Sequence, residues 1–197
     1  MEEDFTCNVV PHPNDLTLFD KKKFNRPYFT NLRSNGPSNT KMPLNDLKII
    51  DCPQVEMFPD GGLPSNIKDV SLSSFKLIAT LRENLDANTC LESLCIENVD
   101  VESFPDDVLL PHSITVLRIS DCPNLKKMDY KGLCHLSSLT LHACPNLQCL
   151  PEDGLPKSIS SLEIWNCPLL EQRCQNPEGQ DWKKIAHIEK LSVRSKF

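Results

Sequence analysis

The chain has 197 residues, of which 39% are hydrophobic and 24% charged, and its formal net charge is −6. This acidic balance argues against a nucleic-acid-binding protein, because phosphate neutralisation requires surplus Lys and Arg. No run approaches the roughly 18 apolar residues of a membrane span, and residues 1–5 are acidic where a signal peptide is basic and then apolar. We therefore expect a cytoplasmic protein.

Residues 1–43 lack the repeating pattern that follows them. The run from Asn35 to Asn39 contains Gly36 and Pro37 and is a strong loop signal. We expect an irregular N-terminal segment or a degenerate repeat here. The prolines at positions 11, 13, 27 and 37 also leave no room for the helix pair that precedes the repeats of a ubiquitin-ligase substrate receptor.

From residue 44 onward one phrase recurs: an apolar residue, two variable positions, an apolar residue, one variable position and a third apolar residue. Six copies begin at Leu44, Ile67, Leu91, Ile114, Leu136 and Ile159, at steps of 22 to 24 residues. A fixed period in the low twenties with this signature predicts leucine-rich repeats, which form an α/β repeat solenoid. This solenoid is curved like a horseshoe and has a parallel β-sheet on its concave side.

The third apolar residue of each phrase should point into the core, because strand side chains alternate between the two faces of a sheet. This predicts one buried row: Ile49, Leu72, Ile96, Ile119, Leu141 and Ile164. The convex side should be mostly irregular, since Pro59, Pro105 and Pro151 recur there at intervals of 46 residues. Residues 78–85 offer the better chance of a helical turn, because their apolar spacing is three to four.

The sequence contains ten cysteines, a number that is compatible with disulfide bonds or with a zinc site. Four of them follow the repeat strands at the ninth position, where this family of repeats favours Asn or Cys: Cys52, Cys122, Cys144 and Cys167. A buried thiol at that position is a weak donor to backbone carbonyls. Without a CxxC pair or a His at finger spacing, we expect free thiols and no metal site.

The last part of the chain departs from the repeat. Trp182, Ile185 and Ile188 follow one another at intervals of three, which predicts a short helix or turn covering the last strand. We therefore place a repeat domain at residues 44–191, with a C-terminal cap at 169–191.

The repeat pattern predicts that the outward positions of the sheet form the binding surface. From them we select the larger and charged side chains as candidate partner-binding residues: Lys48, Glu97, Arg118, His142, Glu163 and Trp165. Trp and Arg dominate interface energies when they are desolvated. The alternative is that Trp165 merely packs on the terminal cap.

Nothing in the sequence indicates an enzyme or a cofactor. Neither a Gly-x-Ser-x-Gly elbow, a His-Glu-x-x-His helix nor a Gly-x-x-x-x-Gly-Lys-Ser/Thr loop occurs. We therefore expect a protein that binds another protein and performs no catalysis.

The C-terminal motifs resemble those of plant coiled-coil nucleotide-binding leucine-rich-repeat disease-resistance proteins. The resemblance is carried by Leu162-Glu-Ile164-Trp-Asn-Cys167-Pro168-Leu169-Leu170, Arg173-Cys174, and Gly179-Gln-Asp181-Trp182-Lys-Lys-Ile185-Ala186-His187-Ile188. It implies an intracellular immune receptor whose repeats recognise pathogen effectors or host targets and hold a nucleotide-binding domain inactive. Because the phosphate-binding loop is absent, we expect a truncated chain without that domain. A stand-alone adaptor or substrate receptor, or an inactive remnant, is the alternative.

Overall fold

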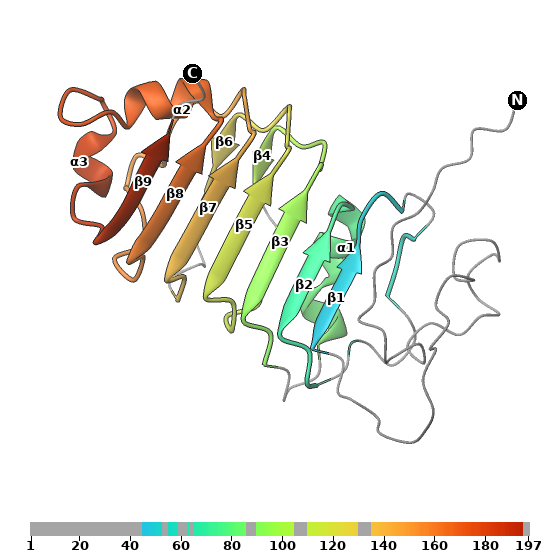
Figure 1. Cartoon of the computed structure of the whole chain (residues 1–197). Coiled ribbons are helices and arrows are strands. Elements are labelled where there is room, and N and C mark those ends of the chain that lie inside the picture. Colours follow the sequence, from blue (N-terminus) through green and yellow to red (C-terminus); the bar gives the residue numbers. More distant parts are fainter. Residues whose placement is uncertain are drawn as a thin grey trace, which may run out of the picture.

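A computed structural model describes residues 45–52, 55–58, 63, 65–85, 90–104, 110–129 and 135–194. Seven parallel strands form one sheet in the order β1-β2-β3-β5-β7-β8-β9. Their bounds are β1 Asp46–Ile49, β2 Asp69–Leu72, β3 Ser93–Glu97, β5 Val116–Ser120, β7 Ser138–His142, β8 Ser161–Trp165 and β9 Lys190–Arg194. Figure 1 shows these strands side by side in chain order. The predicted leucine-rich-repeat solenoid is confirmed.

The inward side chains of neighbouring strands lie opposite one another, in one register across the sheet. Ile49 pairs with Leu72, and the same row continues through Ile96, Ile119, Leu141 and Ile164, as the sequence predicts. Every member of this row is at most 2% exposed. Each repeat buries its apolar residues against its two neighbours, so the core is a continuous column beneath the sheet.

Each of five strands is followed by a residue with a positive φ. These residues are Asp51, Asn98, Asp121, Ala143 and Asn166, with φ between 50° and 57°. Asp and Asn tolerate this left-handed conformation better than other residues with a side chain. The turn aims the backbone N–H groups of Asn98, Asp121 and Ala143 at the carbonyl that ends the next repeat strand. The same turn therefore links successive repeats.

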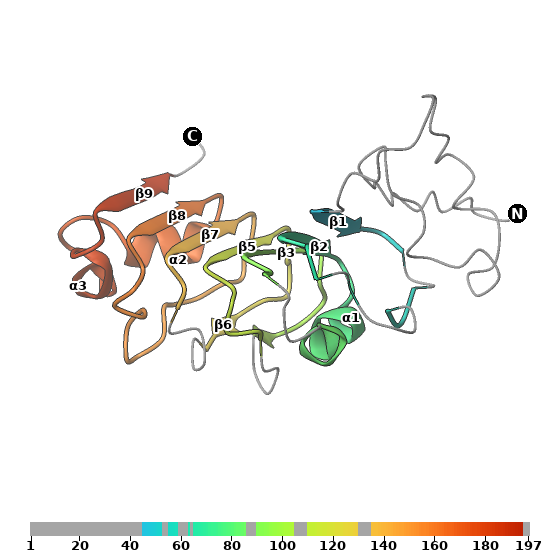
Figure 2. The same ribbon diagram turned by 90° about the horizontal axis from the view of Figure 1, so that it is seen from below.

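The convex side carries short elements beneath the sheet (Figure 2). Helix α1 spans Phe75–Thr80, and a 3₁₀ turn follows at Arg82–Asn84. The helix thus begins three residues before the predicted segment. Strands β4 (Ser103–Phe104) and β6 (Lys127–Met128) pair with each other in a small second sheet. The prolines at 59 and 105, like residues 1–43, lie outside the described residues.

Two helices precede the last strand. Helix α2 spans Pro168–Arg173, and α3 spans Trp182–Ile185, where the sequence predicts a short helix. The chain then returns to the sheet as β9, which reaches Arg194 and so extends beyond the expected end of the domain. Leu191 and Val193 take up the two inward positions of this seventh strand. The C-terminal region is therefore a long last repeat with two helices on its convex side.

The cysteines that follow the strands are buried as expected. Each thiol donates to the carbonyl two residues earlier, at 3.3 Å for Cys122, 3.3 Å for Cys144 and 3.5 Å for Cys167. The Cys144 N–H also donates to the sulfur of Cys167. Hydrogen bonding with Cys122 and Cys167, together with burial, raises the pKa of the Cys144 thiol. Cys52 differs from the expectation of free thiols because it is disulfide-bonded.

Candidate functional site

The outward side chains of the large sheet form rows that cross its concave face. The row at the fifth repeat position comprises Lys48, Ser71, Cys95, Arg118, Thr140 and Glu163. A second row, at the seventh position, comprises Glu97, Ser120, His142 and Trp165, and Arg194 continues it on β9. All six candidate binding residues therefore lie on one face, in two neighbouring rows.

Trp165 and His142 form the centre of the C-terminal half of this face. Their ring centroids lie 4.7 Å apart with the planes inclined at 36°. The Trp165 side chain is nevertheless 50% exposed. Its contact is thus with His142 on the concave side, whereas α2 and α3 lie on the opposite side of the sheet (Figure 2). A large, half-exposed aromatic ring held by a neighbour is typical of a binding anchor.

Charged groups of both signs surround this aromatic pair. Glu163 is exposed two residues before Trp165 on the same strand and faces the same side. Arg118 is exposed on β5 and pairs in register with Thr140, which in turn pairs with Glu163. The carboxylate of Asp121 lies 4.0 Å from Nδ1 of His142. We call four of these residues the C-terminal concave patch: Arg118, His142, Glu163 and Trp165.

Lys48 lies apart from the C-terminal concave patch, and Glu97 lies at its edge. Lys48 is on β1, at the other end of the sheet and three strands away from Arg118. With neighbouring strands about 4.8 Å apart, that separation is about 14 Å. Glu97 is three strands away from Trp165, but it lies on β3, next to β5, and is a diagonal neighbour of Arg118. Of the six predicted residues, the structure therefore separates only Lys48 from the others.

Cys95 lies in the fifth-position row between these parts of the face. Burial and the nearby Glu97 carboxylate raise the pKa of this thiol, although Arg118 and Lys48 act in the opposite direction. The thiol is thus held in its neutral form and contributes no charge to the surface.

Asp181 holds the C-terminal helices in place and does not belong to the concave face. Its side chain is 1% exposed and accepts hydrogen bonds from Nε of Arg173 at 2.9 Å and from the backbone N–H of Leu150 at 3.2 Å. Nζ of Lys184 lies 3.0 Å from the same carboxylate. Burial alone would raise the pKa of Asp181, but the hydrogen bonds from Arg173, Lys184 and Leu150 outweigh it and lower that pKa. This Asp181 cluster ties α2 and α3 to the preceding repeat.

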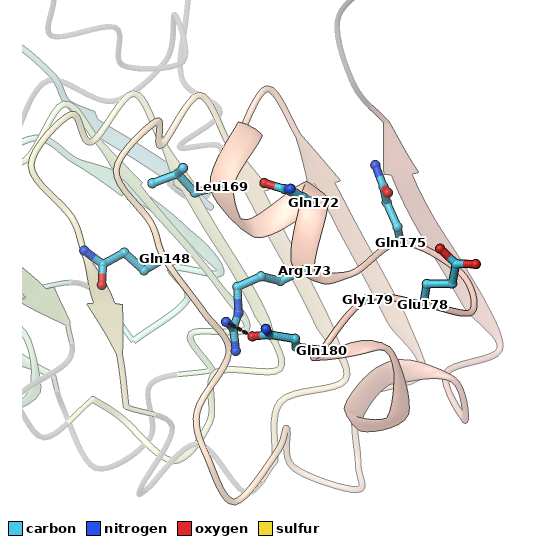
Figure 3. Close-up of a pocket in the computed structure, with 8 residues that line it drawn as sticks. All are labelled: Gln148, Leu169, Gln172, Arg173, Gln175, Glu178, Gly179 and Gln180. Atoms are coloured by element: carbon cyan, nitrogen blue, oxygen red, sulfur yellow. Dashed lines mark hydrogen bonds between the residues drawn. The ribbon is translucent and has the colours of Figure 1, made fainter.

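A hollow of about 520 Å³ lies beside α2 (Figure 3). Its lining consists mainly of amide and charged side chains: Gln148, Leu169, Gln172, Arg173, Gln175, Glu178, Gly179 and Gln180. Arg173 is already held by Asp181 and by Gln180, so its guanidinium is not available to an incoming anion. In the described part of the chain, no three His, Cys, Asp or Glu side chains are grouped as a metal site requires.

The chain is 36% identical over 131 residues to a candidate disease resistance protein of Arabidopsis thaliana, and 44% identical over 52 residues to a candidate disease resistance protein, RGA4, of Solanum bulbocastanum. The chain is similar to plant disease resistance proteins. The first match covers 64% of this chain and 9% of the relative, and the second covers 25% and 5%. The sequence resemblance is confirmed, and the chain spans under a tenth of the length of these relatives.

No protein-family profile and no solved structure matches the chain. Among the residues that the structure describes, no helix is long and apolar enough to cross a membrane.

Strand β9 also contributes to the concave face, which was not predicted from the sequence. Lys190 and Arg194 are exposed, and Arg194 pairs in register with Trp165. The signal was present, because Ile188, Leu191 and Val193 repeat the apolar spacing of the other strands. The step of 29 residues from Ile159 concealed it, since α2 and α3 lengthen this repeat.

Proposed function

We propose that this chain is the protein-binding leucine-rich-repeat domain of an intracellular plant disease-resistance receptor, acting in the cytoplasm. It binds a protein partner through the C-terminal concave patch and performs no catalysis. The partner is a pathogen effector, a host target or the receptor's own nucleotide-binding domain, which the repeats hold inactive. The similarity to two disease resistance proteins supports the receptor role.

The observation that carries the binding proposal is the half-exposed Trp165 ring in tilted contact with the ring of His142. An exposed indole loses little conformational freedom on binding when a neighbour already fixes its ring. Arg118 and Glu163 flank it with charges of opposite sign, which suits recognition of a specific polar rim around an apolar centre. The parallel sheet beneath holds these side chains on a rigid frame.

Calorimetry with the nucleotide-binding domain of a full-length relative tests this proposal. We expect saturable binding by the 197-residue chain and a loss of about tenfold or more in affinity for Trp165→Ala, which is the range of an interface anchor. Arg118→Ala should also weaken binding. Lys48→Ala is the matched control, since Lys48 lies on the same face three strands from Arg118.

The outcomes separate the candidates. Equal affinity for the original chain, Trp165→Ala and Arg118→Ala, with the fold intact by circular dichroism, would refute the patch. Absence of any binding to the nucleotide-binding domain would remove autoinhibition from the proposal.

A further inference from the structure

Two histidines lie side by side in the turns that precede two neighbouring strands of the sheet. His112 precedes β5 and His135 precedes β7. Their ring centroids are 6.4 Å apart and the ring planes are inclined at 86°, so the edge of one imidazole faces the other. Both residues are exposed. The pair therefore joins two successive repeats at the edge of the sheet where the strands begin.

Backbone hydrogen bonds hold both turns in place. The N–H of Ile114 donates to the carbonyl of Pro111 at 3.3 Å and closes the first turn. The N–H of Ser137 donates to the carbonyl of Thr115 at 2.8 Å, which ties the second turn to the start of β5. The backbone thus fixes how far apart the two histidines begin, whereas their exposed rings can rotate on a timescale of picoseconds to nanoseconds.

The distance between the two rings is close to that of a shared metal ion. Imidazole nitrogen is a preferred ligand of zinc, copper and nickel. At an ion–nitrogen distance of about 2.0–2.1 Å, two rings that bind one ion at a tetrahedral angle have centroids about 5 Å apart. The observed 6.4 Å is larger by about 1.4 Å, which rotation of two exposed rings can close.

The pair supplies two protein ligands and leaves the other coordination positions to water. No third His, Cys, Asp or Glu among the described residues completes a metal-binding group. The arrangement therefore differs from a structural zinc site, which has four protein ligands. Calcium and magnesium are poorly suited to it, since they take oxygen ligands. The ligand set selects late first-row divalent ions, which bind imidazole and retain water.

We propose that His112 and His135 together bind one hydrated divalent transition-metal ion. Each ring donates the lone pair of one nitrogen, so both histidines bind in the neutral form. The bound ion bridges the turns before β5 and β7 and stabilises the junction between these two repeats. This site is separate from the C-terminal concave patch and goes beyond the proposed protein-binding function.

The proposal departs from the sequence-based expectation of no metal site. That expectation rested on ligands at short spacing, such as a CxxC pair. His112 and His135 are instead 23 residues apart, about one repeat, and the stacking of the repeats brings them together.

Calorimetry with nickel chloride tests the proposal on the full chain, near neutral pH and with a phosphine reductant. We expect saturable binding of one ion. His112→Phe and His135→Phe each keep an aromatic ring in the pair but remove the ligand nitrogens. Each should weaken nickel binding about tenfold or more, because a single remaining imidazole loses the gain from the second ligand.

Thermal unfolding gives an independent readout of the bridge. A ligand that binds only the folded state raises the melting temperature. Nickel should therefore raise the melting temperature of the original chain, and this rise should largely disappear in His112→Phe and His135→Phe. The metal-free melting temperatures of the variants show separately what the ring contact contributes, so a packing role is distinguished from metal binding.

Three controls locate the ion. His187→Phe removes another exposed imidazole, which no described aromatic ring contacts, and should leave nickel affinity within about twofold. Cys90→Ser removes an exposed thiol and should do the same. Magnesium chloride should give no binding that depends on His112 or His135, because magnesium takes oxygen ligands.

Nickel affinity that is unchanged in both His112→Phe and His135→Phe would overturn the proposal. An equal rise in melting temperature for the original chain and His135→Phe would refute the bridge. Loss of nickel binding in Cys90→Ser, with both phenylalanine variants unaffected, would assign the ion to a thiol instead. None of these results depends on whether the chain binds a nucleotide-binding domain.

Discussion

Removing the Asp181 carboxylate should loosen the C-terminal end of the solenoid. In Asp181→Ala the backbone N–H of Leu150 loses its acceptor inside the protein, which costs about 1–3 kcal/mol. Breaking a buried ion pair costs about 3–5 kcal/mol. The side chains of Arg173 and Lys184 are 35% and 23% exposed, so water partly replaces the carboxylate. We therefore expect a total loss of about 3 kcal/mol, at the low end of these ranges.

Urea unfolding followed by tryptophan fluorescence measures this loss. Trp182 adjoins Asp181 and packs partly against the core, so a Trp165→Phe background makes the signal specific to the C-terminal region. Because repeat proteins unfold from their ends when an end is weakened, the Trp182 transition should precede the circular-dichroism transition. Asp153→Ala, an exposed carboxylate in the turn after Leu150, is the control and should change stability by under about 0.5 kcal/mol.

The same cluster predicts a pH dependence with a defined sign. The folded-state pKa of Asp181 lies below its ordinary value of 3.8. The stabilisation is therefore complete above the unfolded-state pKa and is lost as the pH falls through the lower folded-state value. The difference in unfolding free energy between the original chain and Asp181→Ala should be constant near neutral pH and shrink below about pH 4. A loss under about 1 kcal/mol at neutral pH would refute the assigned role of the buried carboxylate.

Two further predictions concern single backbone positions. A Cβ at Gly179 would lie 2.2 Å from the carbonyl oxygen of Arg173, so Gly179→Ala should destabilise the C-terminal region by about 2 kcal/mol or more. Gly154→Ala, where φ is +80° but a Cβ would meet only Cβ of Lys184 at 4.0 Å, should cost only about 1 kcal/mol; equal losses in chemical denaturation would contradict the clash. Ala143→Asn should raise the unfolding free energy by about 0.5 kcal/mol, since Asn suits its φ of 50°. The control Ala186→Asn, at φ −59°, should give no such gain, and a gain at both positions would point to another cause.

The repeat architecture could be predicted from the sequence because its cause is local and periodic. The spacing of Leu162 and Ile164 already fixes which side of a strand they occupy, and the same spacing in five other repeats fixes the register. The turns after the strands are periodic as well, since Asp or Asn follows four of the strands and Cys follows four.

The Asp181 cluster could not be predicted in this way. Arg173 ends α2, Asp181 precedes α3 and Lys184 lies in α3. The backbone N–H of Leu150, which donates to Asp181, and its carbonyl, which accepts from Lys184, belong to an earlier repeat. No periodic pattern records such a contact. For the same reason the contact between the rings of His142 and Trp165 could not be predicted before the strand register was known.

The equivalence of the strand-ending turns has an evolutionary consequence. Because Asn98, Asp121 and Ala143 make the same backbone bond to the strand that follows, a whole repeat can be gained or lost between any two of them without altering the junction. A repeat inserted between β5 and β7 would move His142 and Trp165 away from Arg118 by one strand width, about 4.8 Å, while the core column stays continuous. Recombination between repeats could thus produce new arrangements of the same surface residues in a single step, ahead of any point substitution.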